Sequence, residues 1–130
     1  MGKYDRYIFA WRERLRQEDD ALRAAEAEAR RSAQVCAERL VTAFSAERVY
    51  LTGSLIRQGR FHSGSDIDLA VVGLRADRYM RALSEIAGLA NREVELIPLE
   101  DATPEMRDYV LKEGVILYER SEISAVEVGH

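Results

Sequence analysis

The 130-residue sequence is poor in the side chains from which disulfide-bonded folds and zinc sites are built. It contains one cysteine, Cys36, and two histidines, His62 and His130. A single cysteine excludes an internal disulfide framework and any zinc site made of several thiolates, so Cys36 is best read as a small apolar residue on a helix. Two isolated histidines without a nearby cysteine or serine nucleophile make no catalytic triad. Any chemistry must therefore come from other side chains.

Long hydrophobic runs are also missing. No apolar stretch approaches the roughly 20 residues that a membrane-spanning helix needs. The first residues, MGKYDRYIFAWRERL, show neither the apolar segment nor the cleavage site of a signal peptide. We therefore expect a cytoplasmic protein without a membrane partner. With 47% hydrophobic and 32% charged residues, the composition is that of a soluble globular protein, and the length suits one domain.

Positive charge is scarce in the C-terminal two thirds of the chain. The formal net charge is −4, and residues 49–130 hold nine Lys and Arg against fourteen Asp and Glu, whereas residues 1–48 hold ten against nine. This distribution argues against direct nucleic-acid binding. If the acidic part handles a phosphate-bearing ligand, it needs metal cations to do so.

Proline and glycine are absent from residues 4–45, a segment rich in Ala, Arg, Glu and Leu. Its apolar residues recur at spacings of three, four and seven, which predicts an amphipathic helix, broken at most once near the middle. So small a domain cannot bury the whole stripe. The helix either packs partly on another subunit, giving a homo-oligomer, or folds back as two helices. The stripe consists of Ile8, Trp11, Leu15, Leu22, Ala25, Ala29, Cys36, Leu40 and Phe44.

After Glu47 the pattern changes to short strands and helices. Apolar and alternating runs between turn residues predict strands, and the order of elements predicts an α/β (α+β) domain in which helices pack on a small mixed β-sheet. We divide the chain into a helical extension (1–46), this domain (47–120) and a loose tail (121–130). Strands are predicted over 48–52, 66–72, 93–98 and 115–118, helices over 75–90 and 103–112, and one helical turn over 54–58.

Two carboxylates open the strand predicted over 66–72. Asp66 and Asp68 point to one face of that strand, with Cα atoms roughly 7 Å apart. Such a pair repels unless a cation lies between them, and Mg²⁺ prefers carboxylate oxygens together with substrate phosphates. Glu95 lies in the middle of the next predicted strand, where an unpaired charge also favours a nearby cation. The alternative is that Glu95 is exposed to solvent on an edge strand. We therefore predict that Asp66, Asp68 and Glu95 hold one or two Mg²⁺ ions.

A glycine and a serine end the first predicted strand. Gly53 lets backbone N–H groups approach a triphosphate closely, and the Ser54 hydroxyl can donate a hydrogen bond to a phosphate oxygen. Arg57, one turn further on, can add positive charge, although a plain surface position suits it equally well. Simple turn chemistry is the alternative for the Gly53–Ser54 pair.

Together, GS…DIDLAVV and VELIPLED resemble the minimal nucleotidyltransferase (MNT) family of the DNA polymerase β-like superfamily, over roughly residues 47–118. The resemblance implies a nucleotidyltransferase-like fold. It also implies that the glycine–serine pair and Arg57 bind the nucleotide, that Asp66 and Asp68 are metal ligands, and that Glu95 activates the attacking hydroxyl. Two departures from the family pattern are a spacer before Asp66 that is one residue longer and Glu95 in place of an aspartate.

Many small members of this family are antitoxins of HEPN-domain RNase toxins, and they transfer AMP from ATP to a tyrosine of the toxin. The resemblance therefore implies a Mg²⁺-dependent protein adenylyltransferase with ATP and a HEPN-type toxin as its partners. Two alternatives stay open. One is a binding module that neutralises its partner by contact without catalysis, and the other is a nucleotidyltransferase that acts on a small molecule or an RNA end.

Overall fold

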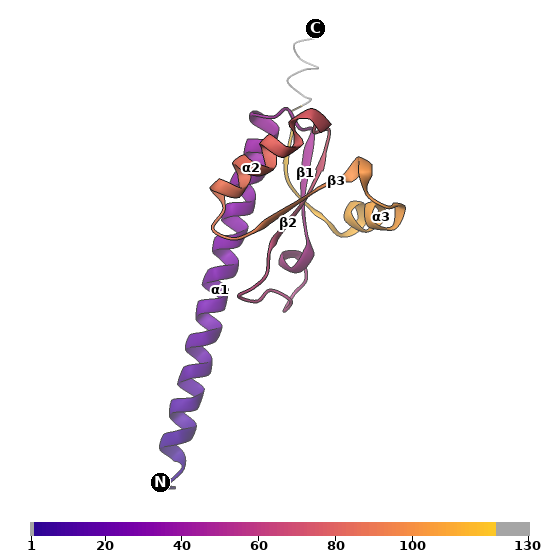
Figure 1. Cartoon of the computed structure of the whole chain (residues 1–130). Helices are drawn as coiled ribbons and strands as arrows, with labels where there is room; N and C mark the ends of the chain where they lie inside the picture. Colours follow the sequence, from indigo (N-terminus) through magenta and orange to yellow (C-terminus); the bar gives the residue numbers. More distant parts are fainter. Residues whose placement is uncertain (1, 122–130) are drawn as a thin grey trace.

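The structure is a computed structural model that describes residues 2–121. Its longest element is helix α1 (Asp5–Thr42). It runs for 38 residues without a break, so the two-helix alternative is wrong. Its C-terminal half is packed in the domain, where Ala29, Ala33, Cys36 and Leu40 are fully buried. The N-terminal half projects away from the rest of the molecule (Figure 1). No helix in the described range is long and apolar enough to cross a membrane.

The four strands form one mixed sheet, as the sequence predicts. They are β1 (Arg48–Thr52), β2 (Ile67–Val72), β3 (Val94–Pro98) and β4 (Val115–Glu119), and their order is β3-β2-β1-β4. Strand β1 is antiparallel to both of its neighbours, whereas β2 and β3 are parallel. A parallel pair needs a crossover connection, and helix α2 (Tyr79–Leu89) lies in that connection.

The remaining helical segments agree with the prediction to within a few residues. The turn after β1 is the 3₁₀ turn η1 (Gly53–Ile56). Near the start of the helix predicted over 75–90, residues Ala76–Arg78 form a 3₁₀ turn, η2, before α2 begins. Helix α3 (Pro104–Glu113) begins after Thr103, whose hydroxyl accepts a hydrogen bond from the amide of Met106 at 3.2 Å. A third 3₁₀ turn, η3 (Leu99–Asp101), follows β3. Of the predicted loose tail, only Ser121 lies within the described residues, and His130 lies outside them.

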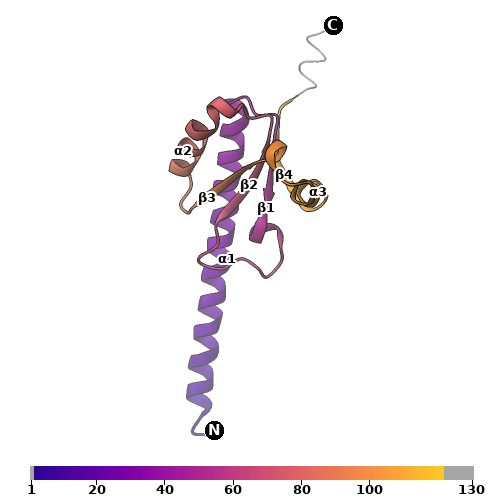
Figure 2. The same ribbon diagram turned by 45° about the vertical axis from the view of Figure 1, so that its right-hand side comes forward.

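The sheet has two unequal faces. Helices α1 and α2 cover one face, and the smaller α3 lies on the other (Figure 2). Side chains alternate between the faces, so that Leu51 and Leu69 enter the large cluster under α1, whereas Tyr50 and Ala70 join a small cluster with Val110 of α3. By the same alternation Asp68 belongs to the less covered α3 face. The large cluster includes Cys36, Leu40, Val49, Leu51, Ile67, Leu69, Val71, Ile86 and Leu96.

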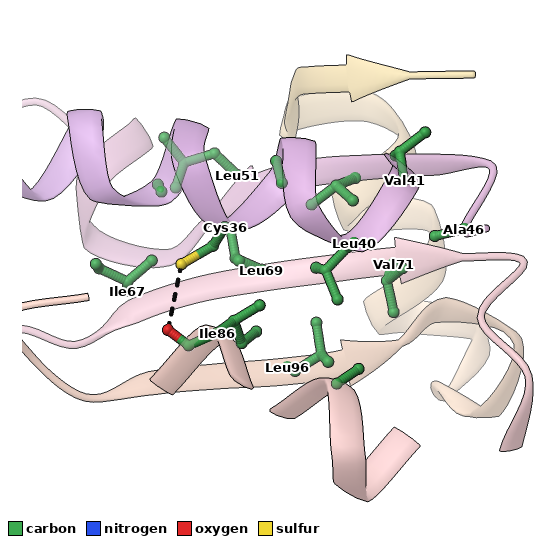
Figure 3. Close-up of a cluster of buried hydrophobic side chains, with 14 of the residues drawn as sticks. Cys36, Leu40, Val41, Ala46, Leu51, Ile67, Leu69, Val71, Ile86 and Leu96 are labelled. Carbon is green, nitrogen blue, oxygen red and sulfur yellow. Dashed lines mark hydrogen bonds between the residues drawn. The ribbon is translucent and has the colours of Figure 1, made fainter. Parts of the chain in front are cut away.

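Cys36 is part of this apolar cluster, as expected for a helix residue of small size. Its thiol is within 3.5 Å of the carbonyl oxygen of Ile86 in α2, to which it donates a weak hydrogen bond (Figure 3). Burial raises the pKa of the Cys36 thiol to about 11, which keeps it protonated and unreactive at neutral pH.

Substitution of Leu40 tests directly how the packing of α1 stabilises the domain. Replacing Leu40 by alanine should cost about 2–4 kcal/mol of unfolding free energy, because the cavity lies under a rigid sheet. Leu111→Ala is the matched control, since Leu111 is about half exposed on α3, and it should cost less than about 0.5 kcal/mol. Urea unfolding followed by circular dichroism measures both. Equal losses in the two variants would contradict this packing.

Candidate active site

Gly53 brings the end of β1 against an acidic side chain. Its φ of +75° is a left-handed conformation that glycine adopts without strain. A Cβ placed on Gly53 would lie 2.0 Å from Oδ2 of Asp68, far closer than atoms can approach. Backbone conformation and available space therefore both require glycine at this position. The turn and the carboxylate of Asp68 are built against each other.

Ser54 follows in the turn η1, and its hydroxyl is buried without a hydrogen-bond partner among residues 2–121. An unsatisfied buried hydroxyl costs about 1–3 kcal/mol, so such a group is rare unless it awaits a ligand or water. The turn itself is held firmly, because Arg30 of α1 donates a hydrogen bond to the carbonyl oxygen of Leu55. The hydroxyl of Ser54 thus belongs to a fixed part of the structure and has unused hydrogen-bonding capacity.

Asp68 is surrounded by groups that disfavour its charge. It lies opposite Thr52 in the antiparallel pair and beside Glu95 in the parallel pair. Burial raises the pKa of the Asp68 carboxyl to about 6, and a hydrogen bond with Glu95 and the charges of Glu95 and Asp66 contribute further. The structure therefore concentrates negative charge at this end of the α3 face. A nearby cation would relieve it.

The other two predicted acids are more open to solvent. Asp66 lies just before β2, which begins at Ile67, so the predicted start of this strand was one residue too early. Glu95 lies within β3 and is exposed, as is Glu93 just before it. Asp66 and Glu95 are among the residues that line an open groove of about 760 Å³ between α2 and the edge strand β3, and Asp68 does not line it. Within residues 2–121, no three or more His, Cys, Asp or Glu side chains are gathered into a ready-made metal site.

The donor set nevertheless fits a divalent cation bound together with a phosphate. Hard cations of this kind take carboxylate and phosphate oxygens, and Mg²⁺ usually keeps several ligands from water and substrate rather than relying on a complete protein cage. Burial and neighbouring acids disfavour the ionised form of Asp68, and the hydroxyl of Ser54 on the adjacent turn has no hydrogen-bond partner among the described residues. The assignment of metal-binding roles to Asp66, Asp68 and Glu95 stays a prediction.

The long spacer before Asp66 is fixed by a residue that sequence spacing did not identify. Arg92 donates a hydrogen bond to the carbonyl oxygen of Ser65 at 2.7 Å, and its guanidinium carbon lies 4.8 Å from the ring centre of the buried Phe61. Ser65 in turn accepts a hydrogen bond from the amide of His62 at 2.9 Å. The extra residue is thus absorbed in a pinned loop. Because Arg92 and Ser65 are far apart in sequence, no local sequence pattern predicts this contact.

Arg57 is exposed and lies on the side of the turn nearest to α3. It lines a shallow groove together with residues of that helix, including Asp108, Tyr109 and Lys112. The structure brings Gly53, Ser54 and Asp68 together but shows no hydrogen bond from the Arg57 side chain within residues 2–121. A role of Arg57 in binding nucleotide stays a prediction.

The fold agrees with that of known nucleotidyltransferases. A family model described as polymerase beta, nucleotidyltransferase, matches residues 34–123. Among solved structures, a minimal nucleotidyltransferase is 27% identical, with a TM-score of 0.55, and the match covers 65% of this chain and 89% of that one. The search of curated proteins found no match.

Two further solved structures with this fold are toxin–antitoxin complexes. A toxin–antitoxin crystal structure with AMP-PNP is 23% identical, with a TM-score of 0.57, over 72% of this chain and 78% of that one. A mutant of the toxin–antitoxin pair MntA-HpeT is 20% identical, with a TM-score of 0.55, over the same shares. Likeness at this distance shows a common fold.

Replacing Asp68 by asparagine should stabilise the protein when no divalent cation is present. The pKa of Asp68 in the folded state, about 6, is above the ordinary value of 3.8, so the folded state binds more protons and stability falls as pH rises through this window. The melting temperature of Asp68→Asn in EDTA should therefore exceed that of wild type by about 1–3 °C at pH 7.5, and by less at pH 4.5. Differential scanning fluorimetry measures both.

Asp77→Asn serves as the control for this measurement, because Asp77 is exposed and pairs with Arg75 at the surface. This control should show no gain. A melting temperature of Asp68→Asn that is equal to or below that of wild type at both pH values would show that the carboxylate is not under electrostatic pressure.

Gly53→Ala should remove ligand binding. The added methyl group would collide with Asp68 and force an L-residue into positive φ, so the turn must move away from the acid. Gly59→Ala is the matched control, since Gly59 also has a φ of +75° but a Cβ there meets nothing within 4 Å. Binding of AMP-PNP with Mg²⁺, measured by calorimetry, should be lost in the first variant and kept in the second. Equal affinities would contradict the fitted turn.

Proposed function

The chain belongs to the polymerase beta nucleotidyltransferase family, and we propose that it transfers AMP from ATP to a hydroxyl group of a partner protein, with Mg²⁺ as cofactor. The observation that supports this most is the Gly53 turn packed against Asp68, with the orphaned hydroxyl of Ser54 beside it. A phosphate oxygen would satisfy that hydroxyl. A divalent cation would relieve the charge that raises the pKa of Asp68.

Each residue has a distinct part in this reaction. Ser54 and the backbone of η1 bind and orient the triphosphate. Asp66, Asp68 and Glu95 would hold Mg²⁺, which when bound neutralises phosphate charge. Glu95 accepts the proton of the acceptor hydroxyl while the oxygen of that hydroxyl forms a bond to the α-phosphorus of ATP. The bond from that phosphorus to the bridging oxygen of pyrophosphate breaks. The exposure of Glu95 leaves room for a macromolecular acceptor.

The proposed acceptor is a tyrosine hydroxyl of a HEPN-type toxin, which makes this chain an antitoxin. Two structures with this fold are toxin–antitoxin complexes, and one of them holds AMP-PNP, an ATP analogue. The exposure of Asp66 and Glu95, at the open groove between α2 and edge strand β3, supports an acceptor presented by another protein. Acidic surroundings make an RNA acceptor the less favourable choice, because phosphate backbones repel carboxylates.

Neutralisation of a partner by contact alone is the second candidate function. The observation in its favour is that, in residues 2–121, the three acids are not gathered into a complete metal site. Glu95 is also one methylene longer than the aspartate that the family pattern carries. Contact and catalysis predict different behaviour of variants that keep the fold but lose the carboxylates.

The experiment that tests the function uses ATP labelled at the α-phosphate, Mg²⁺ and lysate of the source organism. Wild type should label one protein band, whereas the double variant Asp66→Asn, Asp68→Asn should label none, because both charges that hold the cation are gone. Glu28→Gln on the exposed face of α1 is the matched control and should label as wild type does. Hydrolysis of the labelled band identifies the modified side chain.

Three outcomes separate the proposals. A labelled tyrosine that depends on Asp66 and Asp68 supports protein adenylylation. Label in RNA or in a small molecule keeps the nucleotidyltransferase and removes the antitoxin role. No label anywhere, combined with a double variant that still silences a toxin in cells, contradicts catalysis and favours neutralisation by contact.

A further inference from the structure

Six exposed large apolar side chains lie close together at the N-terminal end of the described chain, within residues 4–15. We call residues 4–21 the arm; both views show it extending beyond the sheet as a single helix without a neighbouring element (Figures 1 and 2). Contiguous apolar surface of this kind marks an interaction site rather than ordinary exposure. The exposed fractions on this surface are Tyr4 63%, Tyr7 73%, Ile8 44%, Trp11 57% and Leu15 44%, whereas Phe9, 72% exposed, lies on the other side of the helix.

The apolar stripe of the arm continues the face with which α1 packs on the domain. Leu22 and Ala25 pack against the main core, and Ala29 is fully buried. Moving toward the N-terminus at alternating spacings of three and four residues, the same face reaches Leu15, then Trp11, Ile8 and Tyr4. A repeat of this kind keeps side chains on one side of a helix and suits a second helix packed along it. Glu18 is the one charged residue on this face.

The flanks of the stripe carry complementary groups. Asp5 and Arg12 lie along one flank, and Tyr7 and Arg14 lie along the other, by the 3.6-residue periodicity of the helix. Neither Arg12 nor Arg14 has an ion-pair partner among the residues described. Asp5 accepts a hydrogen bond from the amide of Gly2 and is otherwise open. These groups are therefore free to meet a partner helix.

We propose that the arm is a dimerisation surface and that its occupant is the arm of a second copy of this chain, packed antiparallel. Ile8 then lies beside Trp11 of the second copy, and Tyr4 beside its Leu15. In this alignment Asp5 faces Arg12 of the second copy on one flank, and Tyr7 faces Arg14 on the other. Two-fold symmetry makes each of these pairs twice.

Glu18 decides the direction of packing. In a parallel pair the two copies of Glu18 would face each other across the stripe, which is destabilising for like charges. In the antiparallel pair with Ile8 against Trp11, Glu18 of each arm lies beyond the N-terminus of the other. The charge on the stripe thus excludes one arrangement and leaves the other unaffected.

The available area is enough for a reversible dimer. An aromatic side chain presents about 150–250 Å² when fully exposed, so the stripe and its flanking Tyr7 expose roughly 600 Å² per chain. A pair would bury roughly 1,200 Å² in total, the lower end of stable interfaces. We therefore expect a dimer that dissociates on dilution.

Sedimentation equilibrium over a range of concentrations tests the surface. Wild type should pass from the monomer mass of 14.8 kDa to twice that value, and the double variant Trp11→Glu, Leu15→Glu should stay monomeric. Phe9→Glu is the matched control, because it makes the same apolar-to-acidic change on the opposite side of the arm and should dimerise as wild type does. Leu22 is unsuitable for this test, since it packs against the core of its own chain.

Charge reversal tests the direction. Asp5→Arg should weaken the dimer about tenfold, because it places two cations together, and Asp5→Arg combined with Arg12→Asp should restore it. Thermal melting by circular dichroism confirms that all variants keep the folded domain. A wild type that stays monomeric to several hundred micromolar, or a dimer that persists in Trp11→Glu, Leu15→Glu, overturns the proposal. A dimer unchanged by Asp5→Arg overturns the antiparallel arrangement.

Discussion

The carboxylate of Asp68 is the group on which the arrangement of the site depends. Asp68 lies in β2 between Ile67 and Leu69, whose side chains enter the main core. Hydrophobic packing of these two residues therefore fixes the position of Asp68. The turn at Gly53 closes over it, and Glu95 lies beside it. These contacts disfavour its charge, and the pKa of about 6 measures how strongly they do so. The packing of the core thus holds the Asp68 carboxylate where its negative charge is unfavourable, and a bound cation would stabilise that charge.

Helix α1 links this site to the remaining surface of the protein. Its C-terminal half supplies one wall of the core, and Arg30 anchors the turn that carries Ser54. Its N-terminal half extends past the domain with an apolar stripe and no covering element. The same helix therefore stabilises the fold, anchors the turn that is proposed to bind phosphate and presents the proposed dimer surface. Dimerisation would bring two such domains together through elements that lie outside both sites.

Local sequence patterns were sufficient to predict the strands and the mixed sheet, because alternation of side chains in a strand is a local property. The pairing of Asp68 with Glu95 depends on the register of two strands, which only the structure shows. The continuity of α1 was not predictable, since periodicity does not reveal whether a helix folds back. Arg92 was missed because its contacts with Phe61 and Ser65 join segments distant in sequence. The orphaned hydroxyl of Ser54 is likewise a property of three-dimensional packing.

The most direct test of this account is the pKa of Asp68, followed by nuclear magnetic resonance of its labelled carboxyl carbon. The free protein should titrate with a pKa of about 6. Saturating Mg²⁺ and AMP-PNP should lower this pKa below the ordinary aspartate value of 3.8, because the bound cation favours the charged form. A pKa near 3.8 in the free protein, or one that does not move when both ligands are added, would contradict a site built around this carboxylate.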